Sequence, residues 1–178
     1  MDNAKLTVST PVRSWHEKNG VITFRVTSNG RTGEEWITYF ESRGIIVLAR
    51  WGKDVLRSTG FKPTNGVTTE IAVLKDELFT DADLTTSFIR AEADKRGLTK
   101  PNAEAACLIR ELFTDAEIKA MGLNWIVAMH GPTEDSDRSP LLLGAGRAVD
   151  GSWLSALYGG PVGGWPRGYG FAFAASRK

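Results

Sequence analysis

Residues 124–147 are the stretch that most limits what this chain can fold into. Two apolar runs, NWIVAMH and LLLGAGR, flank the polar, acidic loop GPTEDSDRSP. Each run has the length of a buried strand, and the loop between them holds the glycine, prolines and aspartates typical of a surface connection. The pattern predicts a central strand–loop–strand. Whether the loop at 131–140 is a site or only a solvated connection stays open from sequence.

The remainder of the C-terminal third is also rich in strand signals. Asp150-Gly151 marks a turn into SWLSALY, and the glycine-rich loop GGPVGGWPRG leads to a last strand, GYGFAFAA. In that strand Tyr169, Phe171 and Phe173 alternate with small residues. The small face lets a helix or a second sheet approach closely, while the aromatic face either fills the core or lines a groove.

The N-terminal part predicts a hairpin. KLTVST at 5–10 has the composition of a short strand, and Asn19-Gly20 is a strong two-residue turn signal because both turn positions need a positive φ. Closing on that turn places Glu17 opposite Ile22. His16 then falls on the solvent face, which argues against a catalytic role for it.

Caps mark the helices of the middle of the chain. Thr32 and Glu35 form a capping-box pattern, and Thr80 and Thr114 are further threonine N-caps. The helices expected from these signals span 33–43, 81–96, 102–113 and 115–121. Residues 45–58 have both strand and helix signals, which leaves their structure open. In the helix at 102–113, Cys107 falls opposite the apolar stripe, so it is either exposed or covered by another element.

Composition excludes several classes of protein. The chain has 178 residues, 42% apolar and 24% charged, which suits one globular domain over 1–178. Its 22 basic and 21 acidic residues are spread along the whole length, so the basic patch of a nucleic-acid binder is missing from the sequence. A single cysteine, no secretion signal and no run near the ~20 apolar residues of a membrane helix predict a cytoplasmic protein without a membrane partner.

His130 is the best candidate for catalysis. It ends the run NWIVAMH, and the acidic loop after it offers Glu134, Asp135 and Asp137 as partners that could orient it as a general base. The competing interpretation is a histidine that anchors its own loop. No metal site is predicted, because the loop fails the EF-hand pattern and the chain has no zinc pattern. Gly144-Ala-Gly146 lacks the third glycine of a dinucleotide fingerprint, so no cofactor is expected.

A second candidate site is aromatic. Stacking on aromatic faces holds a sugar, a base or a peptide without any catalytic group. The residues of the C-terminal third that could form such a surface are Trp153, Tyr158, Trp165, Arg167 and Tyr169. The competing interpretation is that these rings fill the core of a small sheet.

The stretch PNAEAACLIRELFTDAEIKAMG, followed by WIVAMH and the ending DGSW…GW…GFAFA, resembles a set of small uncharacterised bacterial proteins. The resemblance covers roughly residues 21–174. It implies a compact, free-standing bacterial protein. It carries no activity and no functional residues.

Together these patterns predict an α+β fold. We expect a largely antiparallel sheet of about five to seven strands, with helices from 33–58 and 80–122 packed on one face. Along the chain follow a hairpin region at 5–30, a helical middle at 80–122 and a β-rich third at 123–176. For function we expect a non-catalytic module that binds a small molecule or a protein through its C-terminal third. The alternative is a small hydrolase or metal-assisted enzyme centred on His130 with Asp135 or Asp137.

Overall fold

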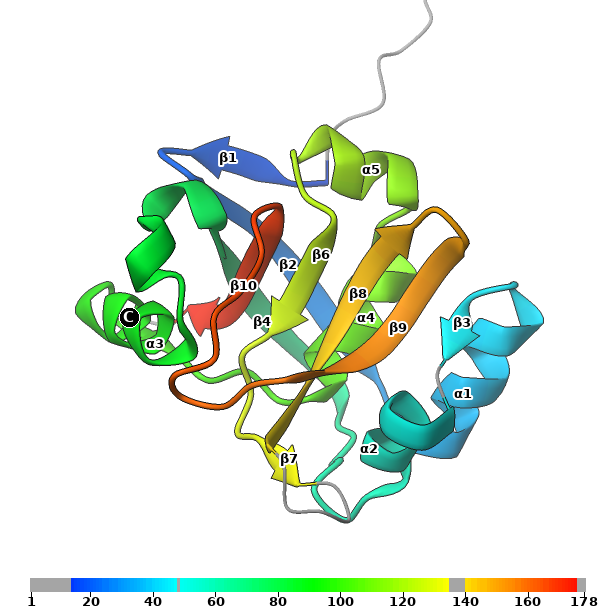
Figure 1. Ribbon diagram of the computed structural model, residues 1–178. Coiled ribbons are helices and arrows are strands. Elements are labelled where there is room, and N and C mark those ends of the chain that lie inside the picture. Colours follow the sequence, from blue (N-terminus) through cyan, green and yellow to red (C-terminus); the bar gives the residue numbers. More distant parts are fainter. Residues whose placement is uncertain (1–13, 48, 135–139, 176–178) are drawn as a thin grey trace, which may run out of the picture.

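The computed structural model describes residues 14–47, 49–134 and 140–175 (Figure 1). The strands are β1 (His16–Lys18), β2 (Val21–Asn29), β3 (Ile46–Val47), β4 (Asn65–Lys75), β5 (Leu98–Thr99), β6 (Trp125–Ala128), β7 (Thr133–Glu134), β8 (Pro140–Ala148), β9 (Gly151–Tyr158) and β10 (Tyr169–Ala175). The α-helices are α1 (Gly33–Ser42), α2 (Asp54–Arg57), α3 (Thr86–Lys95), α4 (Glu104–Leu112) and α5 (Asp115–Ala120). Shorter helical turns are η1 (Ala49–Lys53), η2 (Asp76–Leu78) and η3 (Asp81–Asp83).

All the described strands join one sheet. Its main path runs β1-β2-β4-β10-β6-β8-β9-β3, while β5 pairs with β10 and β7 with β8. Neighbours are antiparallel except for β10 with β6 and β3 with β9, which are parallel. The α+β class and the largely antiparallel sheet are therefore confirmed. The expected five to seven strands were too few, because strands of two or three residues have no alternation for a sequence pattern to reveal.

Local turn and cap signals are confirmed where they rest on neighbouring residues. Asn19 and Gly20 have φ of 52° and 76°, and Glu17 lies opposite Ile22 in the hairpin. Full capping boxes begin α1, through Thr32, and α5, through Thr114. The ambiguous stretch 45–58 contains both kinds of structure: the short strand β3, the π-helical turn η1 and then α2. The strand expected at 5–10 lies outside the described residues.

The helix expected at 81–96 is interrupted. Thr80 caps only the turn η3, and α3 begins at Thr86 with Thr85 as its N-cap. The break has a long-range cause, because the Leu84 carbonyl accepts a hydrogen bond from the Trp165 amide and Thr85 pairs with Gly164. The backbone groups that would continue a helix are thus bonded to the loop before β10.

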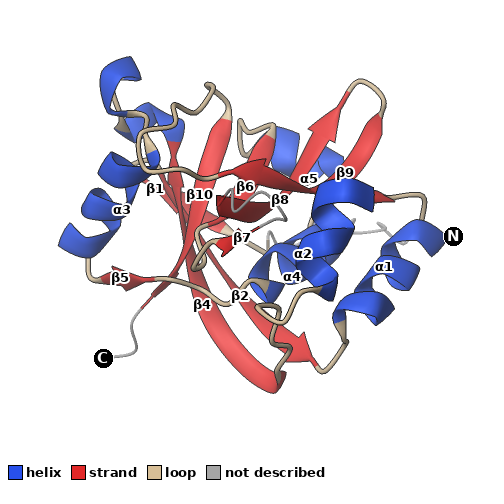
Figure 2. Ribbon diagram, turned by 60° about the horizontal axis from the view of Figure 1, so that its bottom comes forward, coloured by secondary structure: helices blue, strands red, loops and turns tan. Residues whose placement is uncertain are grey.

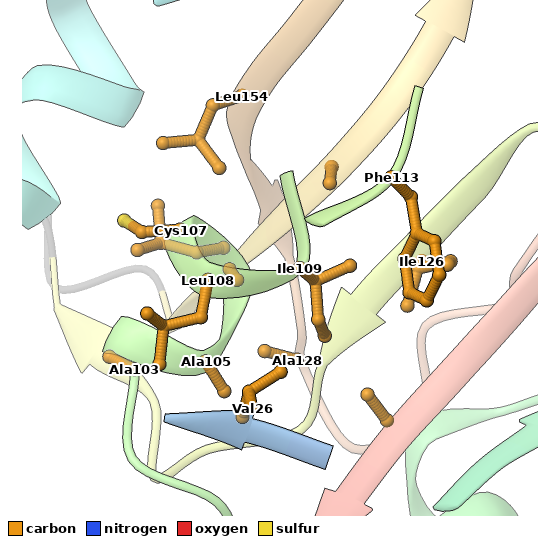
Figure 3. Packing of buried hydrophobic residues seen from close by; sticks show 14 of the residues in the cluster. Val26, Ala103, Ala105, Cys107, Leu108, Ile109, Phe113, Ile126, Ala128 and Leu154 are labelled. Carbon is orange, nitrogen blue, oxygen red and sulfur yellow. The ribbon is translucent and has the colours of Figure 1, made fainter. Parts of the chain in front are cut away.

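Helix α4 is enclosed by the curved sheet. It contacts β2 and β6 as well as β8 and β9, and Figure 3 shows its side chains between Val26 of β2 and Leu154 of β9. Every residue from Glu104 to Arg110 is buried. Of the two environments expected for Cys107, the structure has the covered one, and burial raises the pKa of its thiol well above the usual value.

Two buried charges tie α4 to distant strands. Glu104 accepts hydrogen bonds from the backbone amide of Thr64, at 2.9 Å, and from its hydroxyl. Arg110 donates to the Gly146 carbonyl at 3.0 Å and to the Phe113 carbonyl at 2.7 Å, and its guanidinium lies 3.0 Å from a carboxylate oxygen of Asp115. Buried ions are tolerated when they are paired in this way.

Helices cover both faces of the sheet, not one as expected. We call the face toward α4 the inner face; it is packed against α1, α2, α4 and α5. The opposite, outer face carries a second core in which Ile89 and Ala93 of α3 meet Phe171 of β10. Figures 1 and 2 both show α3 across the sheet from α4. The aromatic face of β10 packs against α3, so this helix lies across the sheet from α1, α2, α4 and α5.

The longest described helices, α1 and α3, have ten residues each, and no helix of the described part is suited to cross a membrane.

We predict that Arg110→Met will lower the free energy of unfolding by about 3 kcal/mol, because it removes the cation and its hydrogen bonds and leaves their buried partners unpaired. Urea unfolding measures the loss. The control is Arg25→Met, an exposed position on β2, where a change within about 0.5 kcal/mol is expected. Equal effects of the two substitutions would contradict the structural role of Arg110.

Candidate functional site

His130 lies just beyond the end of β6, with 2% of its surface exposed. Its Nδ1 is 2.6 Å from the Gly131 carbonyl, and its Nε2 is 3.0 Å from the backbone amide of Leu143 on β8. Because an amide can only donate, Nε2 must accept, and the proton sits on Nδ1, which donates to Gly131. Both ring nitrogens are thus bonded to the backbone.

Arg90 of α3 completes this environment. Its guanidinium donates to the carbonyls of Met129 and His130, each at 2.9 Å. The pKa of His130 is lowered from 6.5 to about 4; burial is the main cause, the hydrogen bond to Gly131 opposes it, and the nearby Arg90 cation adds to the lowering. Burial also lowers the pKa of Arg90 itself. The imidazole is therefore neutral at physiological pH.

In this geometry both nitrogens of His130 are bonded to the backbone, which favours the loop-anchoring interpretation over the catalytic one. Asp135 and Asp137, together with Ser139, lie outside the described residues, and so does the Glu134 side chain. A catalytic role of His130 with these carboxylates stays a prediction. Among the described residues, no three histidine, cysteine, aspartate or glutamate side chains gather as a metal site would require.

The aromatic candidates are brought together only in part. Trp165 and Tyr169 are in contact, with ring centroids 5.8 Å apart. Trp153 lies near the start of β9 on the outer face, and its Nε1 donates to Asp150 at 3.0 Å. Tyr158 lies at the other end of β9, where its ring packs over Gly160. Arg167 is bonded to the turns before α3, donating to the Asp81 carboxylate at 2.8 Å and to the Asp76 carbonyl at 2.7 Å.

Sequence reasoning missed the central ring, Trp125. Its indole lies nearly parallel to the Tyr169 ring beside it, with a centroid distance of 6.3 Å and an interplanar angle of 22°. It also lies over Gly146, its partner in register on β8, so closely that a Cβ there would be 2.1–2.3 Å from three ring atoms. The ring therefore lies flat on the sheet. The sequence did contain a signal, because the alternating glycines of LLLGAGR leave part of one face of that strand without side chains. Finding the ring that occupies this space requires the register between β6 and β8.

Three of these rings, those of Tyr169, Trp125 and Trp153, share the outer face of the sheet. Directly opposed residues on paired strands project to the same side, and the row across β10, β6, β8 and β9 is Tyr169, Trp125, Gly146 and Trp153. All three aromatic residues of the row are half-buried. We call them the aromatic platform. Trp165 stands at its Tyr169 end, fixed by a 3.0 Å hydrogen bond from its Nε1 to the Thr86 hydroxyl.

The platform lies where the described helices leave the outer face open. α3 covers the part of that face over β10, whereas Figure 1 shows no helix in front of β8 and β9 on the side away from α4. A flat indole on glycine, with an open side above it, is able to stack on a planar or ring-shaped ligand.

Comparisons with family models, with curated proteins and with solved structures found no significant match. Evidence for function therefore comes from the geometry of this chain.

We predict that stability falls as the pH drops from 6.5 to about 4. In the unfolded chain His130 takes up a proton at its ordinary pKa of 6.5, whereas in the folded protein it does so at about 4. Protonation of His130 therefore removes about 3 kcal/mol of stability across this window, and this residue adds no further loss below it. NMR titration of His16→Gln, in which His130 is the only remaining histidine, measures the midpoint directly. A midpoint near 6.5 would contradict the buried, neutral ring.

We also predict that Gly146→Ala will displace the Trp125 ring and lower the free energy of unfolding by about 1–3 kcal/mol, because the new methyl group overlaps the indole. The indole N–H signals in NMR and urea unfolding follow the two effects. Gly164→Ala is the matched control, since a Cβ there has no atom within 4 Å. An unshifted Trp125 signal in Gly146→Ala would show that the ring does not lie on the glycine.

Proposed function

We propose that this protein is a non-catalytic binding module that holds a ring-containing small molecule on the aromatic platform. The observation that carries the proposal is the Trp125 indole, which lies flat on Gly146 and beside Tyr169 on a part of the sheet that none of the described helices covers. A ring held in this way is pre-organised, so a ligand loses little affinity to the ordering of flexible side chains.

The support of the platform favours binding over catalysis as the main activity. On the inner face, Arg110 holds the Gly146 carbonyl, and Ser152 donates to Asp115 at 2.6 Å beside the start of β9. These hydrogen bonds hold β8 and β9 in place from the inner face of the sheet. The histidine proposed for catalysis has both nitrogens committed to the backbone.

The platform predicts ligand-dependent stabilisation. A panel of neutral oligosaccharides, nucleosides and aromatic amino acids is screened for a rise in melting temperature, because any ligand that binds only the folded chain raises it by mass action. We expect at least one class to stabilise the wild type.

Trp125→Ala tests where that ligand binds, and we expect it to abolish the shift. Phe88→Ala, an exposed aromatic position on α3, is the matched control and should retain the shift. Circular dichroism verifies that both variants are folded. A shift of equal size in Trp125→Ala, or no shift with any ligand, would refute the proposed function.

A further inference from the structure

The aromatic platform is elongated. The centroids of Tyr169 and Trp125 are 6.3 Å apart on neighbouring strands. Trp153 stands on β9, two strands beyond Trp125, and the two backbones are about 10 Å apart at the usual spacing of strands. Gly146 lies between them in the register, and the Trp125 ring occupies the space where its side chain would be. A single ring covers one end of this row, so a ligand that contacts all of it must consist of several linked rings.

Groups that can bond hydroxyls stand beside the row. The exposed Asp150 receives the Trp153 Nε1 on one carboxylate oxygen, which leaves the other oxygen as an acceptor. Burial raises the pKa of Tyr169, so its hydroxyl stays protonated as a donor. A sugar offers both matching parts: C–H groups that stack on a ring face and hydroxyls that bond at the edge.

The charges at the platform favour a neutral ligand. Arg167 already has its charge matched by Asp81. Arg147 follows Gly146 in β8, so alternation directs it to the inner face, and its Nε donates to the Leu123 carbonyl. Within the described part of the chain, a ligand phosphate at Trp153 would meet the Asp150 carboxylate rather than a free cation. This disfavours nucleotides.

We infer that the platform binds a neutral oligosaccharide lying across β10, β6, β8 and β9, with one sugar ring on Tyr169 and Trp125 and another on Trp153. This inference rests on the proposed binding function and adds the ligand class and its direction on the sheet. The two ends have separate roles: Trp125 contributes to every bound sugar, whereas Trp153 contributes only to chains long enough to reach it.

The test is a titration of the full chain with methyl glucoside, cellotetraose and maltotetraose, followed by NMR of the tryptophan indole N–H groups. We expect at least one tetrasaccharide to bind about tenfold or more tightly than methyl glucoside, as a second stacked ring provides. The Trp125 and Trp153 signals should shift, while that of Trp36, which is 1% exposed, should not. Trp153→Ala should weaken tetrasaccharide binding about tenfold and leave methyl glucoside unchanged.

Other outcomes separate the two proposals. Tetrasaccharides that bind no better than methyl glucoside, or a Trp153→Ala variant that weakens both equally, would overturn the extended arrangement. Adenosine, titrated in parallel, probes stacking without a sugar chain. Adenosine binding that Trp125→Ala abolishes, with neither tetrasaccharide bound, would retain the proposed function and overturn the ligand class. No binding by any of the four probes, together with no stabilisation by the aromatic amino acids of the first screen, would overturn both.

Discussion

The enclosure of α4 by the sheet is the constraint on which the rest of the structure depends. A helix buried from Glu104 to Arg110 has no solvated side on which to place its charges, so both must find partners inside the protein. The partner of Glu104 is Thr64, in the loop before β4, and Arg110 donates to the Gly146 carbonyl on β8. The two halves of the sheet, which join at β10, are thereby held at fixed positions around one helix.

This enclosure also determines what the outer face can do. Arg110 holds the Gly146 carbonyl from the inner side, and the missing side chain of Gly146 admits the Trp125 ring on the outer side. The glycine is required because any Cβ would overlap the indole. Since α1, α2, α4 and α5 all pack on the inner face, α3 is the one α-helix of the described residues that packs on the outer face, where it covers the Phe171 region. Beyond α3, the outer face of the sheet carries the aromatic platform.

Sequence reasoning succeeded where the physical cause lies within a few residues. The Asn19-Gly20 turn, the Thr32 and Thr114 caps and the α+β class all belong to that group. It failed where the cause is distant. The break before α3 depends on bonds to the loop holding Trp165, and the importance of Trp125 depends on a register that a ten-residue loop does not determine. His130 was found, but whether its nitrogens are free is decided by Leu143 across the hairpin.

The two candidate sites lie at opposite ends of one short strand, and both depend on its pairing with β8. At the start of β6, Trp125 faces Gly146; at its end, the ladder stops after Val127 and Gly144. The next amide of β8, that of Leu143, has no strand partner there and bonds to the His130 imidazole instead. The ring thus substitutes for a backbone carbonyl. Only a neutral imidazole accepts that bond, and the low pKa of His130 keeps the ring neutral. The bond extends the β6–β8 pairing, which also places Trp125 on Gly146.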